Sequence, residues 1–176
     1  MRPSESSAAP DATSLRVGLV VSDYHAAITG AMADAARATF LAAGGQDDDL
    51  ISVPAAGSFE LIALANGLAR RGDIDAVVTI GCIITGETTH DQYIAHAVAG
   101  GLAQITVATA IPVAFGVLTC QNLDQAKARA GGAVGNKGEE VMVAAIRTAQ
   151  ELRRLTVERT GRNAGKTQGV ANVRAT

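Results

Sequence analysis

The sequence predicts an α/β protein, a three-layer sandwich in which a four-stranded parallel sheet carries helices on both faces. Two observations carry this prediction. Apolar, β-branched runs alternate along the chain with longer alanine-rich, amphipathic segments. The run at 75–84 is apolar at nearly every position, which indicates a strand buried on both faces. Strands that alternate with helices are joined by right-handed crossovers, and these make the sheet parallel.

The elements follow from these patterns in chain order. We expect strands at 15–22, 49–53, 75–84 and 111–119, and helices at 26–43, 59–71, 90–108, 122–130 and 136–155. Glycine-rich 131–135 is expected to be a flexible loop. The polar arm 1–14 and the tail 156–176 lack apolar periodicity, so we expect disorder there and one folded domain at 15–155. The topology is flavodoxin-like.

Composition excludes several function classes. Hydrophobic residues make up 48% of the 176 and aromatic residues 3%, so the core must be built from Ala, Val, Ile and Leu. A net charge of −2 gives no electrostatic case for nucleic acid. Cys82 and Cys120 lie in apolar runs without a metal-binding spacing, which indicates buried thiols in a reducing compartment. No run is long enough to span a membrane, and the polar start favours the cytoplasm.

Three strand-to-helix loops should meet at one edge of this sheet. The carboxyl ends of parallel strands share an edge, so the topology gathers 23–25, 57–60 and 86–90 there. The turn after the third strand opens a helix and directs free N–H groups to one point, where an anion such as phosphate can bind. His90 in the first turn of that helix suits proton transfer. Thr88 and Asp91 also fit a capping box, and Ser58 fits an N-cap.

Common nucleotide motifs are absent from this edge. The turn after the first strand contains no GxGxxG pattern, and no GxxxxGK[ST] occurs anywhere in the chain. The segment 135–138 has the wrong order for a phosphate loop of that kind. An unrelated flavodoxin-like nucleotide binder therefore ranks last among the alternatives.

The motifs at this edge, taken in order, resemble the lumazine synthase family of riboflavin biosynthesis. The matching features are Tyr24, Gly-Ser-Phe-Glu at 57–60, Ile-Gly-Cys-Ile-Ile at 80–84, Gly-Glu-Thr-x-His at 86–90, Pro-Val-Ala-Phe-Gly-Val-Leu-Thr at 112–119, Arg129 and Gly-Asn-Lys-Gly at 135–138. The resemblance covers about 16–155, and its specificity lies in the order and spacing of motifs that are weak singly.

The resemblance implies a reaction without metal or cofactor. The family condenses 5-amino-6-(D-ribitylamino)uracil with 3,4-dihydroxy-2-butanone 4-phosphate to 6,7-dimethyl-8-ribityllumazine, releasing phosphate and water. It implies that His90 moves protons and that Tyr24 stacks on the pyrimidine. The ring and ribityl chain would be held by Ser58, Phe59, Glu60 and the backbone of Cys82, Ile83 and Ile84. Phosphate would be bound by the N–H groups of Glu87 and Thr88 and by Arg129.

The resemblance also implies an assembly with active sites between subunits. Phe115, Arg129 and Lys137 would come from a neighbouring subunit of a homopentamer. The short 129–137 loop is typical of icosahedral members, and riboflavin synthase is a candidate partner. Without the family, Phe115 fits a core residue, and the two basic residues fit solvated surface charges.

Departures from the family pattern keep one further alternative open. The family usually has Arg at position 85, Phe at 91 and an acidic residue at 92, where this chain has Thr85, Asp91 and Gln92. The 54–57 loop is also two residues longer than usual. These departures motivate a flavin-binding or shell-forming paralogue that does not catalyse the reaction.

Overall fold

The architecture is the predicted three-layer α/β sandwich. The computed structural model describes residues 9–171, with side chains for 9–156. Its four-stranded parallel sheet has the order β2-β1-β3-β4, formed by β1 (Val17–Ser22), β2 (Leu50–Ala55), β3 (Ala76–Ile84) and β4 (Val113–Cys120). The helices are α1 (Ala26–Ala42), a short 3₁₀ turn (Asp47–Asp49), α2 (Leu61–Ala69), α3 (His90–Thr109), α4 (Leu123–Arg129) and α5 (Lys137–Ala171).

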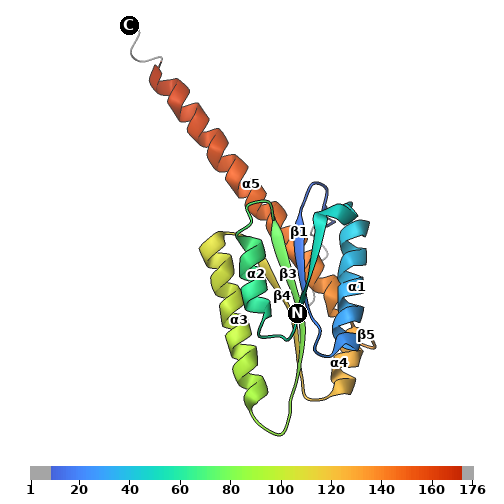
Figure 1. Cartoon of the computed structure of the whole chain (residues 1–176). Coiled ribbons are helices and arrows are strands. Elements are labelled where there is room, and N and C mark those ends of the chain that lie inside the picture. The colour runs from blue at the N-terminus through green and yellow to red at the C-terminus, as the bar shows by residue number, and fades with distance from the viewer. Residues whose placement is uncertain (1–8, 172–176) are drawn as a thin grey trace.

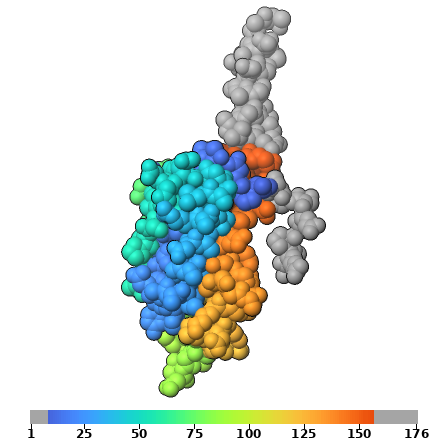
Figure 2. Space-filling model, turned by 90° about the vertical axis from the view of Figure 1, so that its right-hand side faces the viewer, coloured from blue at the N-terminus to red at the C-terminus, as the bar shows by residue number. Residues whose placement is uncertain are grey.

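Two apolar clusters hold the layers together, one on each face of the sheet. Alternate residues of β3 serve the two faces, so Val78 and Ile80 join the cluster under α1 and α5, while Val77 joins the cluster under α2 and α3. Figure 1 shows α2 and α3 on one side of the sheet and α1, α4 and α5 on the other. Figure 2 shows α1 beside α4 and the beginning of α5 on that second face. Burial on both faces explains why β3 is apolar throughout.

Two details differ from the sequence prediction. Residues 131–135 were expected to be a flexible loop, but β5 (Ala130–Gly132) and β6 (Gly135–Asn136) form a small antiparallel pair. The strand expected to end at 53 continues to Ala55, with Pro54 paired opposite Val21. Proline is tolerated there because β2 is an edge strand, where a missing N–H need not break the sheet.

The ends of the predicted domain reach further than the sequence indicated. Ala12 is fully buried and its N–H donates to the carbonyl of Ala43 at 2.7 Å, three residues before the predicted start of the domain. α5 continues past Leu155 to Ala171. The division into arm, domain and tail remains a prediction, and residues 1–8 and 172–176 of the arm and tail lie outside the described residues.

The fold creates a functional edge where the strands end. Each strand of the sheet ends at this edge, which we call the rim, and leads through a loop into a helix. The turn between β3 and α3 projects beyond the rest of the rim (Figures 1 and 2). No helix in the described part of the chain combines the length and apolar character that crossing a membrane requires.

Candidate active site

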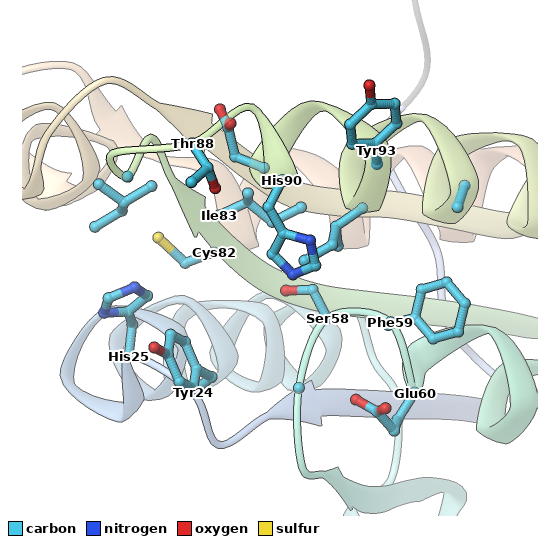
Figure 3. Close-up of a pocket in the computed structure, with 16 residues that line it drawn as sticks. Tyr24, His25, Ser58, Phe59, Glu60, Cys82, Ile83, Thr88, His90 and Tyr93 are labelled. Atoms are coloured by element: carbon cyan, nitrogen blue, oxygen red, sulfur yellow. The ribbon is translucent and has the colours of Figure 1, made fainter.

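A cavity of about 1000 Å³ lies at the rim and unites the three loops that the topology was expected to gather. Nine of the predicted site residues line it: Tyr24, Ser58, Phe59, Glu60, Cys82, Ile83, Ile84, Thr88 and His90. Figure 3 shows that they come from opposite sides, with Tyr24 facing the turn that carries Thr88 and His90. The cavity is therefore bounded by segments far apart in sequence, as expected for a ligand site on a parallel sheet.

Exposed aromatic rings surround the cavity. Tyr24 is 64% exposed, Phe59 54% and Tyr93 73%. Tyr24 follows the end of β1, while Tyr93 lies one helical turn after His90 on α3. Only 3% of the residues are aromatic, yet these three rings are exposed to solvent instead of packing in the core. Their position around one cavity favours a planar ligand.

The turn after β3 has the features of an anion site. Within the described residues, the N–H groups of Gly86, Glu87 and Thr88 donate no hydrogen bond. They precede the first turn of the 20-residue helix α3, where the helix dipole is positive. Gly86 and Thr88 line the cavity, whereas the side chain of Glu87 does not. An anion bound here would be held through the backbone.

Close packing fixes Ser58 against the floor of the cavity. Ser58 is only 8% exposed, and a Cβ added at Gly81 of β3 would lie 2.8 Å from its hydroxyl oxygen. In Figure 3 the Ser58 hydroxyl and the His90 imidazole point into the same space. Gly81 thus allows a polar group from the 57–60 loop to sit beside a buried strand.

The predicted helix caps are not formed. The N-cap of α2 is Glu60 rather than Ser58, and the N-cap of α3 is Thr89, whose side chain makes no capping hydrogen bond. Asp91 does not complete a capping box with Thr88, because its Oδ2 accepts a hydrogen bond from the Thr85 hydroxyl at 3.0 Å. The side chains of Ser58 and Thr88 are therefore free of capping roles at the cavity.

Cys82 closes the floor of the cavity as a neutral thiol. Burial, reinforced by the neighbouring Cys120, raises the pKa of Cys82 to about 11. Burial also raises the pKa of Cys120, and the nearby Arg129 guanidinium opposes this shift. The thiolate is the nucleophilic form of cysteine, so Cys82 is unsuited to covalent catalysis at neutral pH. Within the described residues, no group of three or more His, Cys, Asp or Glu side chains could hold a metal ion.

Three predicted residues lie away from this cavity. Phe115 and Lys137 line a separate groove of about 370 Å³ between the edge strand β4 and α5. Phe115 is 45% exposed, and Lys137 Nζ pairs with Glu140 at 2.7 Å. Arg129 ends α4 and donates from Nη1 to the Gln125 carbonyl at 3.0 Å. A single chain therefore does not bring these residues to His90.

Sequence reasoning missed two polar groups of the cavity, His25 and Asp91. His25 has left-handed backbone angles (φ 60°, ψ 45°), and its ring packs edge-on against Tyr24 with centroids 4.8 Å apart. The signal for His25 was its position directly after the aromatic residue. Asp91 was considered as a cap and as a departure from the family pattern, but not as a site residue, although it directly follows His90.

Comparison with known proteins identifies the family. The family model for 6,7-dimethyl-8-ribityllumazine synthase matches residues 14–153. The chain belongs to the 6,7-dimethyl-8-ribityllumazine synthase family. A relative of that name from Bacteroides fragilis is 41% identical over 133 residues, covering 76% of this chain and 93% of the relative. Another from Phocaeicola vulgatus is 37% identical over 138 residues, covering 78% and 82%.

Membership in this family confirms the interpretation reached from the sequence motifs. The chain is a transferase of riboflavin biosynthesis that forms 6,7-dimethyl-8-ribityllumazine. The parallel α/β sandwich is the flavodoxin-like fold expected for such an enzyme.

Proposed function

We propose that the condensation takes place in the rim cavity and that a second copy of the chain completes it. The carrying observation is electrostatic: among its described lining residues the cavity contains no Lys or Arg, although one substrate bears a phosphate. Its acidic and histidine side chains are His25, Glu60, Asp91 and His90, with the neutral Cys82 thiol below. A phosphate would gain little from such a site without an added cation.

The second copy would supply that cation. Arg129 and Lys137 are the basic residues that the family motifs assign to phosphate and substrate, yet neither lines the cavity of its own chain. Phe115 on the edge strand β4 and Lys137 at the start of α5 line one groove, where another subunit can approach. We propose a homo-oligomer, with a pentamer as the expected ring. Icosahedral assembly and a complex with riboflavin synthase remain predictions, as does the cytoplasmic location favoured by the two free, buried thiols.

Within the cavity, the residues divide the work by chemistry. The exposed Tyr24 ring would stack on the pyrimidine, and Ser58, Phe59 and Glu60 would hold the ribityl chain and ring together with the β3 backbone at 82–84. The N–H groups of Glu87 and Thr88 would bind phosphate. Holding both reactants in one place supplies much of the rate.

His90 would carry the proton transfers. The 5-amino group attacks the ketone carbonyl and water leaves to form an imine; loss of a proton then expels phosphate, and enolisation and ring closure with loss of water give the product. Each step moves a proton, and none needs a redox centre. The His90 imidazole is exposed at the cavity and close to the free N–H groups, so it can take the proton from the carbon next to the one that loses phosphate.

A rate measurement tests the role of His90. His90→Ala should slow lumazine formation, followed by absorbance and corrected for the uncatalysed condensation, by about 10²–10⁴-fold. His96→Ala is the matched control, because this exposed histidine lies on the same helix outside the cavity. An undiminished rate in a folded His90→Ala protein would remove this residue from the mechanism.

Mixing variants tests the site between subunits. His90→Ala and Arg129→Ala proteins should each be nearly inactive, but subunits exchanged between them should regain activity. Random mixing at a head-to-tail interface leaves about a quarter of the sites with both groups intact. Regain to about that level supports the shared site, whereas no regain after verified subunit exchange contradicts it.

A further inference from the structure

A hydrogen bond between two side chains joins the two ends of the projecting turn between β3 and α3, a place that we call the neck of the turn. The hydroxyl of Thr85, the first residue after β3, donates to Asp91 Oδ2 at 3.0 Å. Asp91 is the second residue of α3, so the bond ties the strand end to the helix start. Thr85 is itself anchored to β4, because its N–H donates to the Cys120 carbonyl at 2.9 Å.

Little else fixes the residues between these two. Residues 85–90 are all exposed, and the side chain of the helix N-cap, Thr89, makes no capping bond. In the described structure the N–H groups of Gly86, Glu87 and Thr88 have no acceptor. A loop held mainly at its ends can present these N–H groups to an anion only if the ends keep their spacing.

In this position one carboxylate oxygen of Asp91 has no hydrogen-bond partner among the described residues. This oxygen, Oδ1, is buried. Asp91 lines the rim cavity on one side and a second cavity of about 430 Å³ on the other, which Thr85 also lines. A buried, unpaired carboxylate oxygen opposes folding, and such groups in native proteins call for a functional explanation.

We propose that Thr85 and Asp91 are a positioning pair that holds the 86–88 N–H groups in the arrangement that binds substrate phosphate. Neither side chain touches the reacting atoms. This inference rests on the proposed phosphate role of the Glu87 and Thr88 N–H groups. It gives the hydrogen bond between Thr85 and Asp91 the role of keeping those N–H groups in place.

Thr85→Val removes the hydroxyl and keeps the branched shape. Inorganic phosphate serves as the probe, measured as an inhibitor competing with the phosphate-bearing substrate. We expect its inhibition constant, and the KM for that substrate, to rise about tenfold, since a hydrogen bond to a charged group is lost. The KM for the pyrimidine substrate should stay within about twofold, because the proposed pyrimidine contacts lie on two other loops and on the strand β3 rather than on this turn.

Conservative variants separate the bond from its surroundings. Thr85→Ser retains the hydroxyl and should restore phosphate affinity to within about threefold. Asp91→Asn keeps an oxygen acceptor while removing the negative charge, whereas Asp91→Ala removes both. We therefore expect Asp91→Ala to behave like Thr85→Val, and the double variant to be no worse than either single one.

Thr89→Val is the matched control. Thr89 belongs to the same loop, is also exposed and does not line the rim cavity, so its substitution should leave phosphate inhibition unchanged. Additive losses in the Thr85→Val/Asp91→Ala double variant, or an unchanged inhibition constant in folded Thr85→Val protein, would overturn the positioning pair. If Thr85→Val fails to assemble, the inhibition constants of the two Asp91 variants decide the same question. A weaker phosphate affinity in Asp91→Ala than in Asp91→Asn supports the positioning pair, and equal affinities contradict it.

Backbone amide signals distinguish this inference from the function beneath it. In the unaltered assembly, inorganic phosphate should shift the ¹H–¹⁵N signals of Glu87 and Thr88, and in Thr85→Val the same shifts should need about tenfold more phosphate. Shifts with equal affinity in both proteins reject the pair but keep the phosphate site. No shift in the unaltered protein rejects the phosphate role of this loop and the pair with it.

Discussion

The two ends of the sheet each hold an aspartate, but the two carboxylates differ in their hydrogen bonding. At the amino end, Asp75 uses both carboxylate oxygens: Oδ2 accepts from the Arg16 N–H at 2.8 Å, and Oδ1 accepts from Arg153 Nη2 at 2.7 Å and Nε at 3.1 Å. At the rim, Asp91 uses one oxygen and leaves the other buried without a described partner. The amino end joins β1, β3 and α5, whereas the rim keeps polar groups unpaired.

This difference separates stability from function along one direction of the fold. Arg153 also donates to the Ser14 carbonyl at 3.0 Å, so the amino end ties together three chain segments, those before β1 and β3 and that of α5. The rim instead carries exposed aromatic rings and free N–H groups, which lower stability but can bind a ligand. Substitutions at the two ends should therefore change different observables.

Among the variants that compare the two ends, Tyr24→Ala should give the largest effect and should act on binding alone. Loss of a stacking ring should raise the KM for the pyrimidine substrate by about 5–150-fold, the range reported for base–aromatic stacking. Since Tyr24 is 64% exposed, the midpoint of thermal unfolding should hardly change. Val107→Ala, at an 86% exposed apolar position on α3 outside the cavity, is the control. A fall in stability with unchanged KM would break the comparison.

Asp75→Ala should show the opposite behaviour. It removes the acceptor of one backbone N–H and of the Arg153 guanidinium, so we expect unfolding free energy to fall by about 1–3 kcal/mol. Denaturant titration measures this loss, and kcat should remain unchanged. Asp34→Ala, at an exposed aspartate on α1, should leave stability nearly unaltered. A lower kcat with intact stability would mean that the amino end takes part in catalysis.

The fold was predictable because its signals are local. The apolar residues of β3 and the apolar faces of the helices show in the sequence which positions are buried. The types of the elements and the parallel sheet could therefore be predicted from the sequence pattern. The β5–β6 pair was missed because its glycines are typical of a loop. The pairing itself depends on contacts between the two short strands, which no local pattern records. Pro54 was read as a strand end because an edge position is invisible in the sequence.

The site was predictable only in part, for a related reason. Topology brought Tyr24, Ser58 and His90 to one rim, as expected from the shared edge of parallel strands. The bond between Thr85 and Asp91 depends on the fold of one short turn, and a capping box with Thr88 was the simpler interpretation of Asp91. Phe115, Arg129 and Lys137 could not be placed relative to His90 from one chain at all.

The smallest effects should come from two residues with the same backbone conformation at opposite ends. His25 at the rim and Ala110 at the C-terminus of α3 both have left-handed angles, with φ of 60° and 57°. Glycine adopts this conformation without steric cost, so each substitution should stabilise the protein by at most about 1 kcal/mol. Differential scanning calorimetry can resolve this as a rise of a few degrees at most.

Kinetics should then distinguish the two glycine variants. Ala110→Gly removes only a methyl group from an exposed turn, so KM and kcat should stay unchanged. His25→Gly also removes the ring that packs edge-on against Tyr24, so the KM for the pyrimidine substrate should rise by about 2–10-fold, the worth of one aromatic contact. His25→Phe, which keeps a ring without a titrating nitrogen, should largely restore that KM. Failure of His25→Phe to do so, together with an altered pH profile, would assign His25 a proton-transfer role instead of a positioning one.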